Sequence, residues 1–301
     1  MKKFIIFLIC LTLLSGCASA PEKNEGLSVV SVSFPGYSFA KEILGENADI
    51  TLLLPLGTEA HGYEPTPKDI IKIQNCDLFI YGGGESEHWV EEIISSLDKN
   101  ISTIAMTDCV SLLNVEVPKG AEHNHEHSDE FDPHVWTSPK NAIEITKKIS
   151  DVLCEKDINN AEIYKANTEN YINKLNELDI AFSELETDGK VLVMGDRFPF
   201  LYMAKQYNIS YYAAFPGCSG ETEAGAATVA ELIDAVKSNN IPAVFHTEFS
   251  NRKVCDIICE ETNAKPLMLH SCHNVSAKDF ENGESYLSLM QKNLENLKEV
   301  F

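Results

Sequence analysis

The sequence predicts an α/β protein of two lobes, each a small parallel sheet flanked by helices, joined by one long rigid helix. Short apolar runs of strand length alternate with amphipathic segments twice along the chain, before residue 107 and after residue 189. Such alternation is typical of parallel βαβ units. Between the two series, residues 159–185 carry apolar side chains at helical spacing with no proline or glycine, which favours one connecting helix.

The first series predicts four strands and three helices. The strands are expected at residues 28–33, 50–54, 77–81 and 101–106, and the helices at 37–44, 67–74 and 89–97. The run Gly82-Gly83-Gly84 indicates a turn and not a phosphate-binding loop, because no Lys-Ser/Thr pair follows it and acidic residues lie beside it. A long loop at 107–138 and a helix at 139–154 complete this part of the chain.

The second series repeats the pattern. Its strands are expected at residues 191–194, 209–214, 243–245 and 266–269, and its helices at 200–207, 228–238, 253–262 and 286–300. The predicted boundaries are therefore an N-terminal lobe over 28–156, a linker helix over 157–188 and a C-terminal lobe over 189–301. A two-lobed α/β molecule of this kind suits a ligand cleft between its lobes.

The N-terminus predicts export and lipid attachment. Lys2 and Lys3 precede an apolar run that ends in Leu14-Ser15-Gly16-Cys17, the order of parts in a secretory signal. The ending resembles a bacterial lipobox, in which the cysteine becomes the lipidated first residue. We expect a signal peptide over 1–16, lipidation at Cys17, a tether over 17–27 and an extracytoplasmic protein anchored to the cell membrane. The alternative is an ordinary secretory signal with an incidental cysteine.

Composition excludes one class of partner. The chain has 46 acidic against 24 basic residues and a formal net charge of −22. A surface this acidic repels the phosphates of nucleic acid, and the chain contains no basic cluster. Among the nine cysteines no C-x-x-C pair occurs, so we expect mostly reduced, buried thiols and not a disulfide framework.

Two stiff loops carry a histidine each. His61 lies in Gly57-Thr58-Glu59-Ala60-His61-Gly62-Tyr63-Glu64-Pro65-Thr66-Pro67, between a predicted strand and a helix, and His134 lies in Phe131-Asp132-Pro133-His134-Val135-Trp136. Open α/β sheets bind ligands outside the carboxyl ends of their strands, and imidazole is the commonest metal ligand among side chains. The two loops therefore predict a bound transition metal.

These motifs resemble the metal-binding solute-binding proteins of bacterial ABC importers for zinc and manganese. The resemblance is carried by residues 61–67, by Asp132-Pro133-His134-Val135-Trp136-Thr137-Ser138-Pro139 and by Glu260-Glu261-Thr262-Asn263-Ala264-Lys265, and it extends over nearly the whole mature chain. It implies two four-stranded parallel sheets, a rigid linker helix and a metal held between the lobes by four side chains. It also implies delivery of the metal to an ABC permease, without catalysis. We expect a monomer.

Carried over residue by residue, the resemblance implies His61 and His134 as the first two ligands. The third position falls on Arg197, whose guanidinium has no acceptor atom and cannot ligate. The fourth falls on His270. Three neutral histidines suit Zn²⁺ first and Mn²⁺ second, with one coordination position open. The candidate donors for that position are Cys218, Glu223, Cys272 and His273.

Several of these residues have a second interpretation. Cys218 and Cys272 are equally consistent with a disulfide between them. His273 is interpreted first as a surface residue. Arg197 suits a salt bridge to a cleft carboxylate such as Asp196 or Glu223. It also suits an anion clamp, which would make the protein a binder of a metal chelate or an anionic solute.

Two further hypotheses stay open at this point. Three histidines with an open position are also a catalytic geometry, but a zinc hydrolase is disfavoured because the chain has no H-E-x-x-H helix. His123, His125 and His127 resemble a shortened histidine-rich loop, and loose metal binding and a solvated acidic loop are equally consistent with them.

Overall fold

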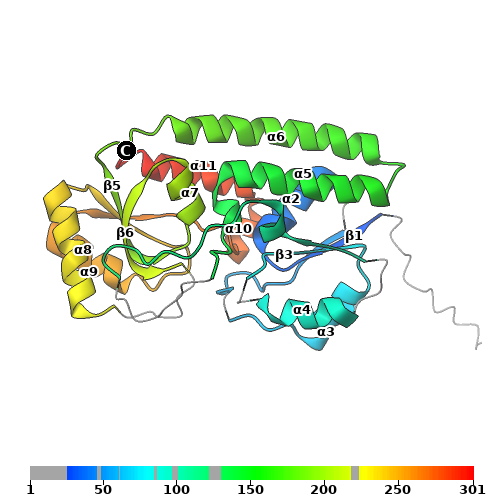
Figure 1. Ribbon diagram of the computed structural model, residues 1–301, viewed down its shortest axis with the longest axis horizontal. Helices are drawn as coiled ribbons and strands as arrows, with labels where there is room; N and C mark the ends of the chain where they lie inside the picture. The colour runs from blue at the N-terminus through cyan, green and yellow to red at the C-terminus, as the bar shows by residue number, and fades with distance from the viewer. Residues whose placement is uncertain are drawn as a thin grey trace, which may run out of the picture.

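The computed structural model describes residues 26–45, 49–60, 62–84, 87–96, 101–121, 130–217 and 224–301. Figure 1 shows two lobes side by side, with the long helix α6 (Ala161–Ser183) running along one edge of both. Each lobe contains a four-stranded parallel sheet. The predicted fold class, two α/β lobes connected by one long helix, is confirmed.

The N-terminal lobe is built on a sheet of order β2-β1-β3-β4. Its strands are β1 (Ser28–Ser31), β2 (Asp49–Leu52), β3 (Leu78–Tyr81) and β4 (Ser102–Ala105). Its helices are α2 (Phe34–Leu44), α3 (Pro67–Gln74) and α4 (Trp89–Ser96), and a 3₁₀ turn, η3 (Met106–Cys109), follows β4. Figure 1 shows α3 and α4 together on the side of the sheet away from α6.

Helix α2 begins three residues before its predicted start. Proline is tolerated in the first turn of a helix because the N–H groups there have no intrahelical partner. Gly36 sits directly on the sheet, where a Cβ atom would lie 2.5 Å from Ser31 Oγ and 2.7 Å from Ile80 Cγ2. The glycine therefore permits the close approach of helix and strands, a tertiary reason that local propensity does not show.

The C-terminal lobe repeats the arrangement with the order β6-β5-β7-β8. Its strands are β5 (Val191–Phe198), β6 (Ser210–Pro216), β7 (Ala243–His246) and β8 (Lys265–Met268). Its helices are α7 (Leu201–Gln206), α8 (Ala226–Asn239) and α9 (Lys253–Thr262). In Figure 1, α8 and α9 cover the outer end of this lobe.

Strand β5 is four residues longer than predicted. Its pairing with β6 shifts register between Met194 and Arg197, and Arg197 then pairs with Phe215. At Gly195, inside the shift, a Cβ atom would lie only 2.6 Å from the Cα of Cys255. The glycine lets α9 pack on the strand, and the extension places Arg197 near the carboxyl end of a strand instead of in the expected loop.

The two lobes share one hydrophobic core. It is contributed by β-strands of both sheets and by α2, α5 (Pro139–Lys156), α6 and α11 (Tyr286–Leu297). After β8 the chain returns to the N-terminal lobe through a short helix that was not predicted, α10 (Ala277–Glu281). Tyr286 at the start of α11 donates its N–H to Ser38 Oγ at 2.9 Å and packs on Phe39. The lobes are thus joined by a continuous core as well as by α6.

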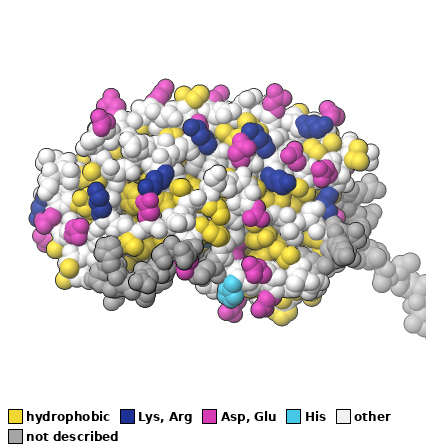
Figure 2. Space-filling model, in the orientation of Figure 1, with side chains coloured by type: hydrophobic (Ala, Val, Ile, Leu, Met, Phe, Trp, Pro, Cys, Tyr) yellow, Lys and Arg dark blue, Asp and Glu magenta, His cyan; other side chains and the backbone are white. Residues whose placement is uncertain are grey.

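The face of the molecule drawn in Figure 2 mixes charged, hydrophobic and other side chains. Figure 2 shows acidic and basic side chains interspersed over the visible face, with no large basic patch on it. Within the described ranges, no helix has the length and hydropathy needed to cross a membrane.

Candidate metal centre

A pocket lies between the two lobes at the ends of several strands. It encloses about 370 Å³, part of it open to solvent. His134 and Arg197, the latter near the end of β5, line it together with residues from the loops after β2, β5, β6, β7 and β8: Thr58, Glu59, Ala60, Pro199, Gly217, Thr247, Glu248, Phe249, Ser271, His273 and Asn274. The position is the one expected for a ligand in open α/β sheets.

His134 is fully buried and firmly oriented. Its Nδ1 lies 2.9 Å from Asp132 Oδ1, and its backbone N–H donates to the same oxygen at 2.8 Å. Tyr202, on α7 of the other lobe, donates its hydroxyl to the carbonyl of Asp132 at 2.8 Å. An imidazole with Nδ1 bound to a carboxylate is oriented to coordinate a metal through Nε2. The short 3₁₀ turn η4 (Val135–Thr137) follows this histidine.

The glycine turn predicted at residues 82–84 supports this loop. Gly83 and Gly84 both have positive φ, 88° and 102°. A Cβ atom on Gly84 would lie 2.9 Å from Pro133 Cβ. The backbone of the turn therefore packs directly against the loop that carries His134, which a larger residue would prevent.

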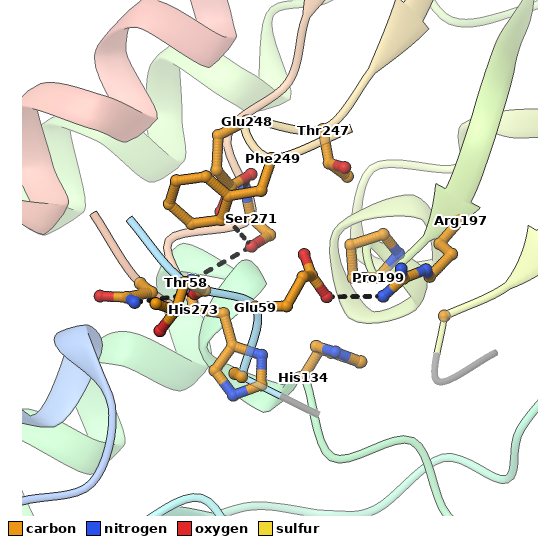
Figure 3. Close-up of a pocket in the computed structure, with 13 residues that line it drawn as sticks. Thr58, Glu59, His134, Arg197, Pro199, Thr247, Glu248, Phe249, Ser271 and His273 are labelled. Carbon is orange, nitrogen blue, oxygen red and sulfur yellow. Dashed lines mark hydrogen bonds and ion pairs between the residues drawn. The ribbon is translucent and has the colours of Figure 1, made fainter. Parts of the chain in front are cut away.

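His273 is the second imidazole in the pocket. Its ring centroid lies 5.6 Å from that of His134 and 4.9 Å from that of Trp136. Its backbone N–H donates to Ser271 Oγ at 3.1 Å, and its carbonyl accepts from Phe34 N–H at 3.0 Å. Figure 3 shows the two histidines side by side at the base of the pocket. His273 is therefore a partly exposed residue that lines the pocket.

His270, the residue implied as the fourth ligand, does not line this pocket. It is 2% exposed, its Nδ1 accepts the N–H of Cys272 at 3.0 Å, and Asn293 on α11 binds its backbone N–H and carbonyl at 2.7 and 2.8 Å. Glu248 lies 3.6 Å from the same ring nitrogen. This geometry assigns His270 to the packing of the loop after β8 and gives no support to its role as a ligand.

The chain turns between the two histidines at Cys272, which has φ of 60°. That thiol is completely buried in the shared core. Burial, and secondarily the Glu248 carboxylate, raise the pKa of Cys272 well above its usual value. Cys272 does not line the pocket, so the structure gives no support to its role as the fourth donor. It is also a free thiol, which contradicts the alternative of a Cys218–Cys272 disulfide.

Arg197 forms a salt bridge, but with a partner that the sequence did not indicate. Its Nη1 lies 2.7 Å from Glu59 Oε2, across the boundary between the lobes (Figure 3). Asp196, one of the partners considered, instead accepts the backbone N–H and the hydroxyl of Thr247. Glu59 lies two residues before His61 in the same loop, and that proximity was the only sequence signal for it.

Several predicted site residues lie outside the described residues: Cys17, His61, His123, His125, His127, Cys218 and Glu223. Among the residues that the structure does describe, no group of three or more His, Cys, Asp or Glu side chains is arranged to hold a metal ion. What the described part brings to one pocket is two imidazoles, His134 and His273, and the Glu59–Arg197 pair.

The chain is similar to zinc-binding proteins over its whole length. It is 33% identical to the zinc-binding lipoprotein AdcA of Streptococcus pneumoniae (strain ATCC BAA-255 / R6), covering 100% of this chain and 61% of that protein. It is 32% identical to the high-affinity zinc uptake system protein ZnuA of Bacillus subtilis (strain 168), covering 98% of this chain and 95% of that protein. The chain thus spans about three fifths of the length of the streptococcal relative.

A solved structure extends the similarity to three dimensions. The crystal structure of the Zn(II)-bound ZnuA-like domain of Streptococcus pneumoniae AdcA superimposes with a TM-score of 0.75 at 34% identity, covering 91% of this chain and 98% of that domain. The model of the family described as "Zinc-uptake complex component A periplasmic" matches residues 29–300. The chain therefore belongs to the family of periplasmic A components of zinc-uptake complexes.

Proposed function

We propose that this protein captures a transition metal, Zn²⁺ first and Mn²⁺ second, in the pocket between its lobes and delivers it to an ABC permease. One observation carries the proposal. His134, buried and oriented by Asp132, lies with its ring centroid 5.6 Å from that of His273 in a pocket between two α/β lobes. Relatives over the full chain are named zinc-binding and zinc-uptake proteins, which supports the choice of metal.

The proposed ligand set is His61, His134 and His273. Neutral imidazoles suit Zn²⁺, and the Irving–Williams order favours zinc over manganese at nitrogen donors. His61 is proposed from its loop and its motif, since it lies outside the described residues. His273 takes the place that the sequence assigned to His270, because His273 lines the pocket and His270 does not.

The proposed role is reversible binding and not catalysis. A binding protein must release its cargo, so the bound cation has to be able to dissociate from the pocket unchanged. We further propose that the protein works outside the cytoplasm as a monomer and that a lipid on Cys17 anchors it to the cell membrane. Lipobox-like residues support the anchor, and the streptococcal relative is named a lipoprotein.

A zinc titration followed by thermal unfolding tests the proposal. A ligand that binds the native state stabilises it by about 2.7 kcal/mol when its free concentration is 100 times the Kd. The melting temperature of the chelator-treated protein should therefore rise with Zn²⁺, and the His134→Ala variant should lose that rise. An unchanged melting temperature of the wild-type protein at saturating Zn²⁺ would overturn the proposed function.

A further inference from the structure

The salt bridge between Arg197 and Glu59 has an unusual position. It joins the two lobes inside the same pocket that His134 and His273 line. The Arg197 side chain is 18% exposed and the Glu59 side chain 46% exposed. Figure 3 shows Glu59 extending into the pocket toward Arg197, beside the two imidazole rings. A carboxylate that zinc accepts as a ligand is thus held next to the proposed ligands by a group that has no lone pair to donate.

Both partners are presented by well-anchored backbone. Arg197 belongs to β5, and its N–H donates to Asp196 Oδ1, while the other oxygen of Asp196 binds Thr247. On the opposite side, the loop of Glu59 is tied to the segment after β8. There Asn274 donates to the carbonyls of Pro55 and Thr58 at 2.8 and 2.9 Å. The two side chains can therefore separate by rotation while their backbones stay in place.

The second carboxylate in the pocket is already committed. Glu248 accepts the N–H of Ser271 at 2.8 Å and its hydroxyl at 2.6 Å, and the Glu248 side chain is 7% exposed. Removing it from these donors would leave buried polar groups unsatisfied. The Glu59 side chain, in contrast, is 46% exposed, and an ion pair of a solvent-accessible carboxylate contributes less to stability. Of these two carboxylates, Glu59 is therefore the one that can be exchanged at the lower cost.

We propose that Glu59 is a cation-binding carboxylate of this pocket and that Arg197 competes with the bound metal for it. The inference rests on the proposed function. When the cation enters, the Glu59 carboxylate leaves the guanidinium and binds the metal, so that Arg197 lowers the metal affinity and favours release. The positive charge in the pocket acts in the same direction, because a guanidinium and a divalent cation repel each other.

A competition titration of Zn²⁺ against a chelating indicator tests this exchange. Glu59→Gln, isosteric and half exposed, should weaken zinc binding by about 10-fold to 100-fold, the range for loss of a group that supports a metal site. Arg197→Met should tighten it by about threefold to tenfold, because the competing ion pair is worth roughly a few-fold in equilibrium constant. In the Glu59→Gln background, Arg197→Met should tighten zinc binding less than in the wild type, because only the electrostatic repulsion is then removed.

Two variants control for charge alone. Glu64→Gln removes an exposed carboxylate three residues after His61 that does not line the pocket. Lys205→Met removes a cation that pairs with Glu116 at 2.7 Å outside the pocket. Both should bind zinc within about twofold of the wild type, because screened surface charges act weakly over distance.

Three results would overturn the exchange. Zinc affinity of Glu59→Gln within twofold of the wild type removes Glu59 from the site. If Arg197→Met binds zinc more weakly than the wild type does, Arg197 supports metal binding and does not compete with it. If Arg197→Met tightens zinc binding equally in the wild-type and Glu59→Gln backgrounds, electrostatic repulsion alone explains the effect of Arg197. If the wild type itself fails to bind zinc, the proposed function falls, whereas binding that depends on His134 but not on Glu59 removes this inference alone.

Discussion

Asp132→Asn is the substitution that most directly probes how the pocket orients its buried histidine. One oxygen of Asp132 receives both the backbone N–H of His134, at 2.8 Å, and the Nδ1 nitrogen of its ring, at 2.9 Å. Asparagine keeps an acceptor oxygen of the same shape but loses the negative charge. The imidazole therefore stays in position while its basicity as a metal ligand falls.

The expected loss follows from that contact. Removing a group that orients a metal-binding histidine costs about 10-fold to 100-fold in affinity, or about 1.4 to 2.7 kcal/mol. Because the amide preserves the geometry, we expect Asp132→Asn near the lower end and Asp132→Ala near the upper end. Competition titration with Zn²⁺ measures both, and chelator-treated samples should show nearly equal melting temperatures for the wild type and Asp132→Asn.

Asp157→Asn is the matched control. Asp157 also accepts side-chain hydrogen bonds, from Asn160 at 2.7 Å and Tyr164 at 2.9 Å, but it caps α5 and does not line the pocket. This variant should bind zinc as the wild type does. A zinc affinity of Asp132→Asn within twofold of the wild type would refute the orienting role, and an equal loss in Asp157→Asn would show that the effect is not local.

Three further variants separate the site from its scaffold. Tyr202→Phe removes the hydroxyl that donates to the carbonyl of Asp132 and should lower the free energy of unfolding by about 1–2 kcal/mol. Urea denaturation measures this loss. An unchanged midpoint would show that this hydrogen bond between the lobes does not stabilise the fold. Cys272→Ala should leave the zinc Kd unchanged, because the thiol is buried in the core; a tenfold loss in titration would restore it as a donor. Asp69 forms a capping box with Thr66 at the start of α3. Burial raises the pKa of Asp69, but hydrogen bonds, led by that from Thr66, outweigh it and hold the pKa below its usual value. Its stabilising effect is therefore present at neutral pH and lost as the pH falls through the lowered pKa. Asp69→Asn should lower the free energy of unfolding by about 1 kcal/mol at pH 7 and by less in acid. Urea denaturation at both pH values measures the two losses, and equal losses would contradict the lowered pKa of Asp69.

The alternation of strands and helices was visible in the sequence because its signals are local. Apolar periodicity, a proline at a helix start and glycines at turns depend on neighbouring residues, and the helix predicted at 67–74 agrees with α3 (Pro67–Gln74). The misses have tertiary causes. Strand β5 continues past its predicted end because Gly195 lets α9 pack closely on it, a contact between segments about 60 residues apart in the sequence.

The candidate site likewise has one part that the sequence indicated and another that only the tertiary structure decided. His134 was proposed from its own segment, since Pro133 and Asp132 beside it indicate a stiff, polar loop. The choice between His270 and His273 depended on the left-handed conformation of Cys272, a residue type that rarely adopts it. Residue identity alone did not show which of two nearby histidines would face the pocket.

The sequence by itself therefore determined the two-lobed α/β fold and the resemblance to a metal-binding family, and it singled out Arg197 at a position where a ligand was expected. Only the tertiary structure decided what Arg197 does there. Its partner, Glu59, is 138 residues away in the chain and belongs to the other lobe. The packing of two sheets around a common core brings the two charges within 2.7 Å, and no local pattern encodes a contact that the folding of the whole chain creates.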